Sequence, residues 1–342
     1  MQKRMLSVFL TVLLLLSLTA CGGAAESGGQ RTVYTMDTVM SLTVYGENAG
    51  SALDAAEQTL RDLNDLLDRH SETSAVSALN RDGTIYSPPL AELTETALAV
   101  NAATDGAFDP TVAPVLDAWD FTGSAPRVPA EDELSALLAR VGAENVGVSD
   151  GVIDLANGAQ LDFGGIAKGF AGDEVRRALE ELGVSSAVID LGGDVGVLGA
   201  KPDGGDWRIA VKDPADSSRF LGVLSVSDRF VVTSGAYERG FERDGVRYHH
   251  ILDPKTGRPA QSGLVSVTVV CESGVWADAL STACFVLGGE ESLALRDRLA
   301  AEGVADFELI LVTDDGRVRC TDGLKDRFAP SGEGGYVYEQ TA

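Results

Sequence analysis

The spacing of hydrophobic and polar residues separates strand-like from helix-like segments at the start of the chain. Residues 32–45 (TVYTMDTVMSLTVY) alternate well enough to predict a first strand. Apolar residues then recur every three or four positions over residues 48–67, which is the spacing of a helix with one buried face. A turn-rich segment, SETSAVSALNRDG, follows at residues 71–83. The pattern therefore begins as strand, helix and turn.

The rest of the chain mixes short strands with helices. Helical spacing and boundary residues predict helices over residues 89–104, 131–141, 171–182, 277–287 and 291–302. Short apolar runs punctuated by glycine predict strands over residues 151–155, 160–163, 187–191, 207–211, 221–226, 230–233, 247–251, 264–270, 307–312 and 317–320. Strands in hairpin-like succession, interrupted by helices, favour an α+β fold with mixed, largely antiparallel sheets flanked by helices. The sequence contains no repeat and no clear linker, so we interpret residues 32–342 as one domain.

The first residues have the pattern of a secretory signal that ends in a lipidation site. Lys3 and Arg4 precede an apolar run, and the sequence LTAC places small residues directly before Cys21. The run is shorter than the roughly 20 residues that a spanning helix needs, which argues against an uncleaved anchor. We therefore predict a signal peptide over residues 1–20, a lipid such as palmitate on Cys21, and a flexible tether over residues 21–31. The chain is then expected to be extracytoplasmic and anchored to the cell membrane by its lipid.

The charge of the chain limits its partners. Of its 342 residues, 52 are acidic and 27 basic, and without Lys3 and Arg4 the formal charge of −25 becomes −27. A field of this sign repels nucleic acid and anionic lipid, so small molecules and proteins are the expected partners. A phosphate-bearing ligand needs local cations or a metal ion to overcome the repulsion. The remaining cysteines, Cys271, Cys284 and Cys320, have no zinc-site spacing, and we interpret them as buried residues, although two of them could form a disulfide.

One segment suits an anion-binding turn. LDFGGIAKGFAGD, residues 161–173, places a strand end at Asp162, then Gly164 and Gly165, then Lys168 near an expected helix start. It matches neither GxxxxGK[ST] nor GxGxxG. Glycines that allow close backbone approach, exposed helix amides and a lysine can together hold an anion and a metal. The alternative is a tight turn whose lysine points into water.

Two further segments carry candidate chemistry. Asp278 and Thr282 lie four residues apart on an expected helix, so that their carboxylate and hydroxyl oxygens share one face and suit Mg²⁺. The alternative for Asp278 is an acidic first turn that is favoured by the helix dipole. His249 and His250 lie at a strand end before a Pro-Gly turn, and a histidine there suits proton transfer. The alternative is an ordinary cross-strand position.

Taken together, segments along nearly the whole chain resemble the ApbE family, the FAD:protein FMN transferases. These segments are TMDTV (35–39), GAFDPTVAPVLDAW (106–119), LDFGGIAKGFAGD (161–173), IDLGGDV (189–195), VVTSGAYER (231–239), HILDPKTGRP (250–259), and SVTVV with ADALSTACFVLG (266–288). The resemblance implies a single T-fold-like catalytic domain. It implies Mg²⁺-dependent transfer of FMN from FAD to a Ser or Thr hydroxyl of an acceptor protein, with release of AMP. Its acceptors would be subunits of membrane electron-transfer complexes or other extracytoplasmic flavoproteins.

The resemblance also implies roles for individual residues. The metal ligands would be Asp278, Thr282 and the backbone carbonyl of Gly165, a position where glycine has no side chain to offer. His250 would transfer a proton, and His250 and Asp278 would be the catalytic residues. The residues implied to contact FAD are Met36, Ala107, Phe108, Asp109, Asp162, Lys168, Ile251 and Leu252. His70 stands where the family commonly has an aromatic residue, and we expect a weaker flavin contact there.

Two other activities fit the same resemblance. Water in place of the acceptor hydroxyl would make the chain an FAD diphosphatase that yields FMN and AMP. A chain that binds flavin without reaction would be a storage or delivery lipoprotein. The products formed from FAD, Mg²⁺ and an acceptor distinguish the three.

Overall fold

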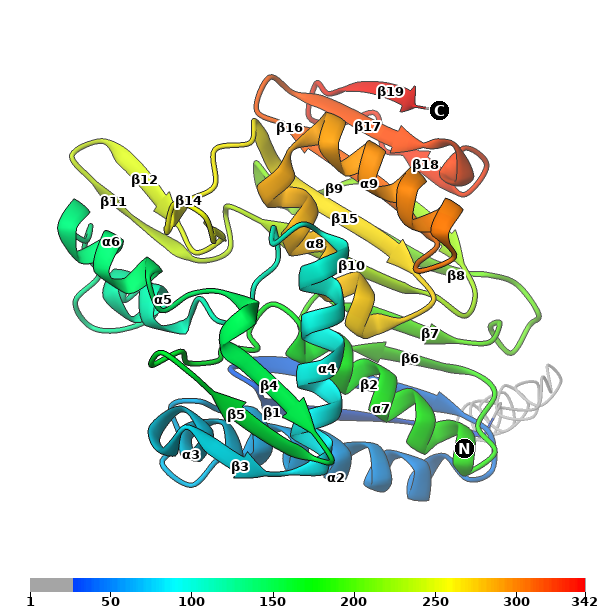
Figure 1. Ribbon diagram of the computed structural model, residues 1–342. Coiled ribbons are helices and arrows are strands. Elements are labelled where there is room, and N and C mark those ends of the chain that lie inside the picture. The colour runs from blue at the N-terminus through cyan, green and yellow to red at the C-terminus, as the bar shows by residue number, and fades with distance from the viewer. Residues whose placement is uncertain (1–26, 342) are drawn as a thin grey trace, which may run out of the picture.

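A nine-stranded sheet runs through the domain in the computed structural model, which describes residues 27–341 (Figure 1). In spatial order its strands are β1 (Gly28–Thr35), β2 (Thr38–Tyr45), β6 (Ala187–Asp190), β7 (Val195–Leu198), β10 (Phe230–Gly235), β15 (Leu264–Cys271), β16 (Phe307–Thr313), β17 (Arg317–Thr321) and β19 (Val337–Thr341). Neighbouring strands are antiparallel except β17 and β19, which are parallel. The predicted mixed, largely antiparallel sheet is confirmed.

Four smaller sheets surround the large one within the described residues. Their strands are β18 (Phe328–Pro330), β9 (Asp216–Val226) and β8 (Trp207–Asp213); β3 (Thr84–Tyr86), β5 (Val152–Leu155) and β4 (Val146–Ser149); β11 (Gly240–Arg243) and β12 (Val246–His249); and β13 (Leu252–Asp253) and β14 (Arg258–Pro259). The pairing within each is antiparallel.

Helices pack against the large sheet. The helices are α2 (Ala49–Leu67), α3 (Ala75–Asp82), α4 (Pro88–Ala103), α5 (Ala113–Trp119), α6 (Glu131–Leu138), α7 (Ala167–Glu181), α8 (Gly274–Leu287) and α9 (Gly289–Glu302), with short 3₁₀ turns at Ala143–Asn145 and Asp322–Leu324. The helices that contact the large sheet most are α2, α7, α8 and α9. In Figure 1, α2 lies at the β1–β2 end of the sheet and α9 at the β16 end. None of the helices over residues 27–341 combines the length and the apolar character that crossing a membrane requires.

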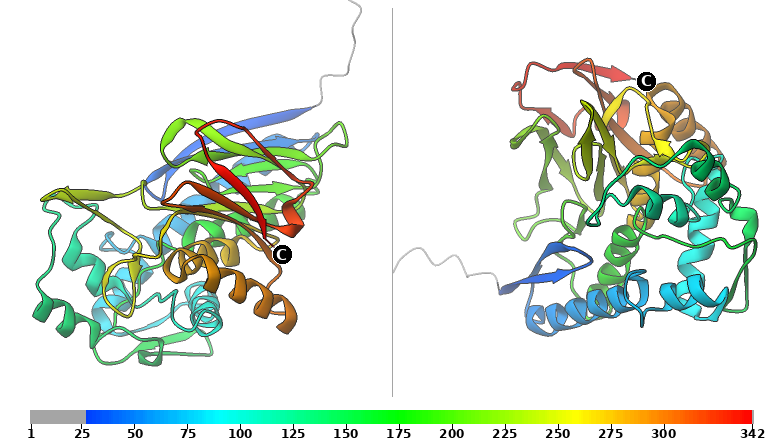
Figure 2. Two further views of the ribbon diagram at one scale, coloured as in Figure 1. Left: turned by 90° about the horizontal axis from the view of Figure 1, so that it is seen from above. Right: turned by 90° about the vertical axis from the view of Figure 1, so that its left-hand side faces the viewer.

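The large sheet separates two layers of core. Leu309 and Leu311 of β16 pack with α8 and α9, whereas Ile310 and Val312 point the other way and pack with β8 and β9. Successive residues of a strand face opposite sides, so a continuous apolar run such as β16 fits a strand that is buried on both faces. The right-hand view of Figure 2 shows the sheet of β18, β9 and β8 on one side of the large sheet and the helices on the other.

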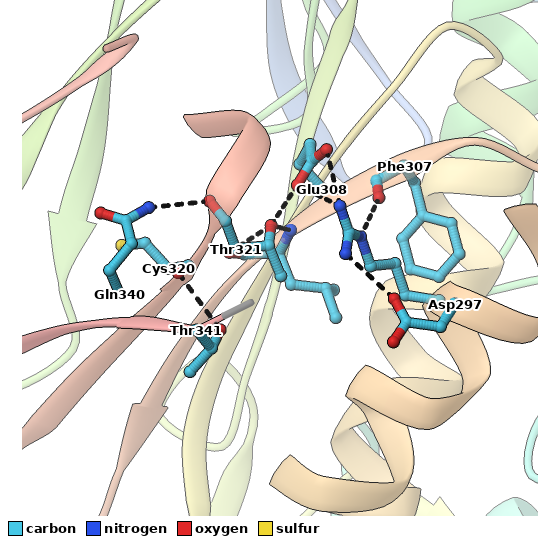
Figure 3. A network of polar contacts seen from close by, with 9 residues as sticks. Asp297, Phe307, Glu308, Cys320, Thr321, Gln340 and Thr341 are labelled. Atoms are coloured by element: carbon cyan, nitrogen blue, oxygen red, sulfur yellow. Dashed lines mark hydrogen bonds and ion pairs between the residues drawn. The ribbon is translucent and has the colours of Figure 1, made fainter. Parts of the chain in front are cut away.

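Polar contacts fasten the C-terminal strands to α9 and β16 (Figure 3). Arg296 donates to Glu308 at 3.0 Å, and Thr321 donates to the same carboxylate. The Thr321 hydroxyl also accepts from the backbone N–H of Leu309 at 2.9 Å, and Gln340 donates to the Thr321 carbonyl at 3.1 Å. Thr321 is fully buried, and a buried hydroxyl is stable when its hydrogen bonds are made.

The three cysteines of the described part of the chain are free and buried. They lie in β15, α8 and β17. Burial raises the pKa of both Cys284 and Cys320 to about 12 and raises that of Cys271. The interpretation of these cysteines as buried residues is confirmed, and the alternative of a disulfide among them is not.

Several predicted boundaries differ from the structure. The single strand predicted over residues 32–45 is a hairpin, because Met36 and Asp37 take left-handed backbone angles (φ 48° and 57°) and reverse the chain. The segment predicted as turn-rich contains α3, which is capped by the Ser74 hydroxyl. Residues 160–163 form a single bridge, Gln160 to Val112, in place of a strand.

The helix predicted over residues 171–182 begins earlier, and another was not predicted. α7 starts at Ala167, and its glycines hid this start, because glycine argues against a helix by propensity. Gly169 and Gly172 lie inside the helix, where neighbouring groups leave no room for a side chain. α5 was not predicted because Pro114 and its short length hide the helical spacing. The helix predicted over residues 131–141 ends at Leu138.

The N-terminal predictions fall mostly outside the described residues. The signal peptide over residues 1–20 and the lipid site at Cys21 lie there. The predicted tether over residues 21–31 is corrected at its end, because Gly28 already pairs with Tyr45 and β1 continues from it. The domain therefore begins a few residues earlier than position 32.

Candidate active site

The site forms where α7 and α8 cross. A Cβ atom at Gly169 would lie 2.1 Å from the carbonyl oxygen of Gly274, so the crossing requires glycine. The Gly169 N–H donates to Asp278 Oδ2 at 2.9 Å, a bond that fixes the carboxylate against the neighbouring helix. The crossing thus brings Lys168 of α7 beside Asp278 of α8, although the two lie far apart in sequence.

Lys168 lies between two buried carboxylates. It is ion-paired with Asp194, which is 4% exposed, and Asp278 is 5% exposed. Burial, reinforced by the nearby Asp194 carboxylate, raises the pKa of Asp278 to about 7. Burial likewise raises the pKa of Asp194, against the opposing effect of Lys168. Burial alone would lower the pKa of Lys168, but both carboxylates outweigh it and raise it, so the lysine carries a positive charge.

Hard oxygen donors gather around Gly165 and Thr282. A Cβ atom at Gly165 would lie 3.3 Å from Thr282 Oγ1, so the backbone of the glycine turn approaches the α8 hydroxyl closely. The Ser234 hydroxyl lies 3.4 Å from Thr282 Oγ1 and 2.7 Å from Ser281 Oγ. The described residues contain no cluster of three His, Cys, Asp or Glu side chains with metal-site geometry. One carboxylate, one hydroxyl and a backbone oxygen fit Mg²⁺, which commonly takes its other ligands from water and phosphate.

A cavity of about 360 Å³ opens beside this cluster, and we call it the first cavity. Every predicted site residue other than Cys21 lines it: Met36, His70, Ala107, Phe108, Asp109, Asp162, Gly165, Lys168, His250, Ile251, Leu252, Asp278 and Thr282. The lining combines aromatic and aliphatic side chains with a few polar groups, as ligand sites commonly do. The structure thus brings the predicted residues together, while their individual roles stay predictions.

The two adjacent histidines have different surroundings. His250 lines the first cavity, and its Nδ1 donates to the carbonyl oxygen of Arg239 at 3.3 Å, which leaves Nε2 as the unprotonated nitrogen. Burial lowers the pKa of His250 to about 4, so the ring is neutral at pH 7. His249 instead donates through Nε2 to Ala260 and packs edge-on against Phe285. Both rings have a lowered pKa, but only His250 lines the cavity and has the position of a general base.

Several lining residues were missed by the sequence reasoning. Asp194 lies in the segment IDLGGDV but was given no role, and its ion pair with Lys168 shows only in three dimensions. Arg69 donates to Asp162 at 2.5 Å and to Asp117 at 2.7 Å, so a carboxylate predicted to contact the ligand already has a partner. Asn64 accepts from the backbone N–H of Met36 at 2.9 Å and supports the hairpin turn at the cavity. The sequence feature that came nearest to indicating these residues is the position of Arg69 directly before His70.

The fold and the first cavity define a class: a mixed α/β domain with a deep site whose lysine and hard oxygen donors suit a phosphorylated ligand. Within that class, the ApbE family model matches residues 36–305, and the chain belongs to the ApbE family.

Relatives and solved structures match this chain over most of its length. An FAD:protein FMN transferase of Treponema pallidum is 36% identical over an alignment that covers 92% of this chain and 93% of the relative. One of Vibrio cholerae is 34% identical over 82% of this chain and 87% of the relative. The crystal structure of the ApbE protein of Thermotoga maritima superposes with a TM-score of 0.81, at 32% identity over 89% of this chain and all of that one. The Pseudomonas stutzeri flavinyl transferase ApbE gives 0.77 at 31% identity, over 89% and 97%.

Proposed function

We propose that the chain is an FAD:protein FMN transferase and that the first cavity is where FAD reacts. Membership of the ApbE family and relatives of this name over most of the chain support the activity. The observation that carries the site is the grouping of Lys168, Asp278 and Thr282 on the wall of one cavity with the aromatic and aliphatic residues predicted to contact FAD.

The reaction exchanges the phosphoanhydride bond of FAD for a phosphate ester bond to the acceptor. The acceptor hydroxyl oxygen bonds to the phosphorus on the FMN side of FAD, and the bond from that phosphorus to the bridging oxygen breaks. AMP leaves with the bridging oxygen and its electron pair. The hydroxyl proton passes to Nε2 of His250, which is neutral at pH 7 and lines the cavity. The acceptor is left with FMN on its serine or threonine.

Repulsion between the charged diphosphate and this acidic protein is what opposes the binding of FAD most. Lys168 is held in its charged form by two carboxylates and provides a cation at the cavity wall. Asp278, Thr282 and the carbonyl of Gly165 would hold Mg²⁺. When bound, Mg²⁺ neutralises charge on phosphate oxygens and orients the diphosphate. Asp278 must lose its proton to act as a ligand, and its raised pKa makes this easiest above about pH 7.

The remaining lining suits the rings of FAD. Met36 lies at the hairpin turn, and Phe108 and Ala107 form an apolar wall with Ile251 and Leu252. Flat aromatic ligands gain most from burial against such side chains. His70 is exposed at the rim, which agrees with a minor contact.

A product assay tests the function. The purified chain is incubated with FAD, Mg²⁺ and a candidate acceptor. Covalent flavin fluorescence on the acceptor supports transfer, free FMN supports hydrolysis, and unchanged FAD supports storage. Asp278→Ala should abolish transfer by removing a metal ligand, and wild-type flavinylation by this variant at saturating Mg²⁺ would refute the metal assignment.

We also propose that the mature chain begins at a lipidated Cys21, is held at the extracytoplasmic face of a membrane and modifies subunits of membrane electron-transfer complexes. The apolar run before Cys21 supports this. Mass spectrometry of the mature N-terminus tests it. A diacylglyceryl-modified Cys21 is expected, and an intact residue 1 in the membrane fraction would contradict it.

A further inference from the structure

A second cavity, of about 580 Å³, lies against the first. Lys168, Asp194, Thr233 and Glu238 line both cavities and therefore form a shared wall. The hairpin of β1 and β2 also borders both cavities, because Met36 lines the first cavity and Val39 lines the second. The reacting diphosphate is proposed to lie at Lys168, so the second cavity reaches the same reaction centre from another direction.

Two cations on β8 face the second cavity. Arg208 and Lys212 alternate with buried neighbours along the strand, so both point outward into this cavity. Lys212 Nζ lies 3.7 Å from where a Cβ atom at Gly193 would be, over the glycine turn after β6. Neither cation forms an ion pair within residues 27–341. The carboxylates of Asp213 and Asp216 close to them are taken by Arg219.

None of the carboxylates that line the second cavity is ion-paired with Arg208 or Lys212 within residues 27–341. Asp190 accepts the backbone N–H groups of Gly192 and Gly193 at 3.1 and 3.0 Å, and Asp194 pairs with Lys168. Asp190 keeps its charge, and Glu238 lies on the shared wall, so three acidic side chains line the cavity together with Lys168, Arg208 and Lys212. Arg208 and Lys212 lie on the same face of β8 with no acidic side chain bound to either within residues 27–341, so an anionic group of a partner can pair with them at this position.

An apolar patch borders the cavity. Val39 is 60% exposed, and Tyr34, which pairs with it across the hairpin, is 70% exposed. Residues directly opposite in neighbouring strands place their side chains on the same face, so the two form one surface. Tyrosine and arginine are enriched at protein-binding surfaces, so Tyr34 and Arg208 fit such a surface.

From this geometry we infer that the second cavity, with Arg208, Lys212, Tyr34 and Val39, binds the acceptor protein through an acidic segment that also carries an apolar side chain. The inference rests on the proposed function, because a transferase must admit an acceptor while FAD is bound. An acceptor hydroxyl that enters over the shared wall would reach the diphosphate beside Lys168, the residue that lines both cavities.

Charge reversal tests the surface. The probe is the protein of the same cell that carries covalent flavin, purified from cells that lack this enzyme so that its hydroxyl is free. Arg208→Glu and Lys212→Glu should each raise the KM for this acceptor about tenfold and weaken the salt dependence of transfer, with FAD affinity unchanged. Lys325→Glu makes the same charge change at an exposed lysine outside both cavities and should leave both constants unchanged. A loss of FAD or AMP affinity, with acceptor KM unchanged, would overturn the inference and assign these cations to the nucleotide.

A cross-linking experiment separates this inference from the proposed function, because it needs no reaction. p-Benzoylphenylalanine at position 39 should cross-link to the acceptor on illumination. The same substitution at Val337, which is 57% exposed on β19, should not. Equal yields at the two positions would overturn the inference, even if the wild type transfers FMN. Cross-linking at position 39 without any flavinylation by the wild type would refute the transferase activity and leave the surface supported.

Discussion

The crossing of α7 and α8 makes Gly169→Ala the sharpest test of how the site is assembled. The added Cβ would lie 2.1 Å from the carbonyl oxygen of Gly274 and 2.7 Å from Asp278 Cβ. Because such contacts are essentially never below 3.0 Å, the helices must separate by roughly 1 Å. Overpacking of this kind costs about 1–3 kcal/mol. A shift of about 1 Å in a catalytic group can cost about 100-fold in rate.

Two measurements check these magnitudes. Thermal unfolding followed by circular dichroism should show a Tm lower by several degrees, and FMN transfer should fall about 100-fold at saturating FAD. Gly50→Ala is the matched control, since Gly50 also lies in a helix and has nothing within 4 Å of the added carbon. It should be neutral or slightly stabilising. Wild-type Tm and wild-type transfer for Gly169→Ala would refute the tight crossing.

Three further predictions concern the charges of the site. The affinity for Mg²⁺, measured by calorimetry, should rise about tenfold per pH unit below the Asp278 pKa of about 7, because the proton must leave first; an affinity independent of pH would contradict this. At saturating Mg²⁺ the acid limb of kcat/KM should lie near pH 4, the pKa of His250, and a limb near pH 6.5 would exclude His250 as the buried base. Asp194→Asn should lower the free energy of unfolding by about 2 kcal/mol because Lys168 loses its partner, and adding Lys168→Met should restore part of it in urea unfolding; a double variant no more stable than the single one would contradict the ion pair.

The Asp278 pKa also determines how the metal-free chain responds to pH. Its folded-state pKa lies above the ordinary value of 3.8, so the folded state holds a proton that the unfolded state releases. The stability that this proton contributes is present below about pH 4 and is lost as the pH rises to about 7. Mg²⁺ should offset the loss, because it favours the ionised carboxylate in the folded state alone.

Sequence pattern predicts the long helices and the antiparallel strands well. The apolar residues of α2, α8 and α9 recur at helical spacing, because each helix buries one or more faces against the sheet. The hairpin at Met36 was not predicted because its two strands continue a single alternation and the turn has no glycine. The early start of α7 was not predicted because its glycines are signs of helix crossing, yet by propensity they argue against a helix.

The site residues were likewise only partly predictable from the sequence. Asp278 and Thr282 share a helix face, so local spacing alone suggests that they act together. Asp194 and Arg69 meet their partners only through tertiary packing, and no local pattern reports such a pair. The family resemblance therefore predicted the residues of the first cavity better than the ion pairs that hold them in place.

The residues that line the first cavity come from segments that begin at Met36 and end at Thr282. No smaller part of the chain contains the site, so a ligand that binds there should stabilise the whole domain. At a free concentration of 100 times Kd, a ligand adds about 2.7 kcal/mol to the folded state. Occupancy by FAD should then decide how long the enzyme survives proteolysis, and a cell short of flavin should lose the transferase itself along with its product.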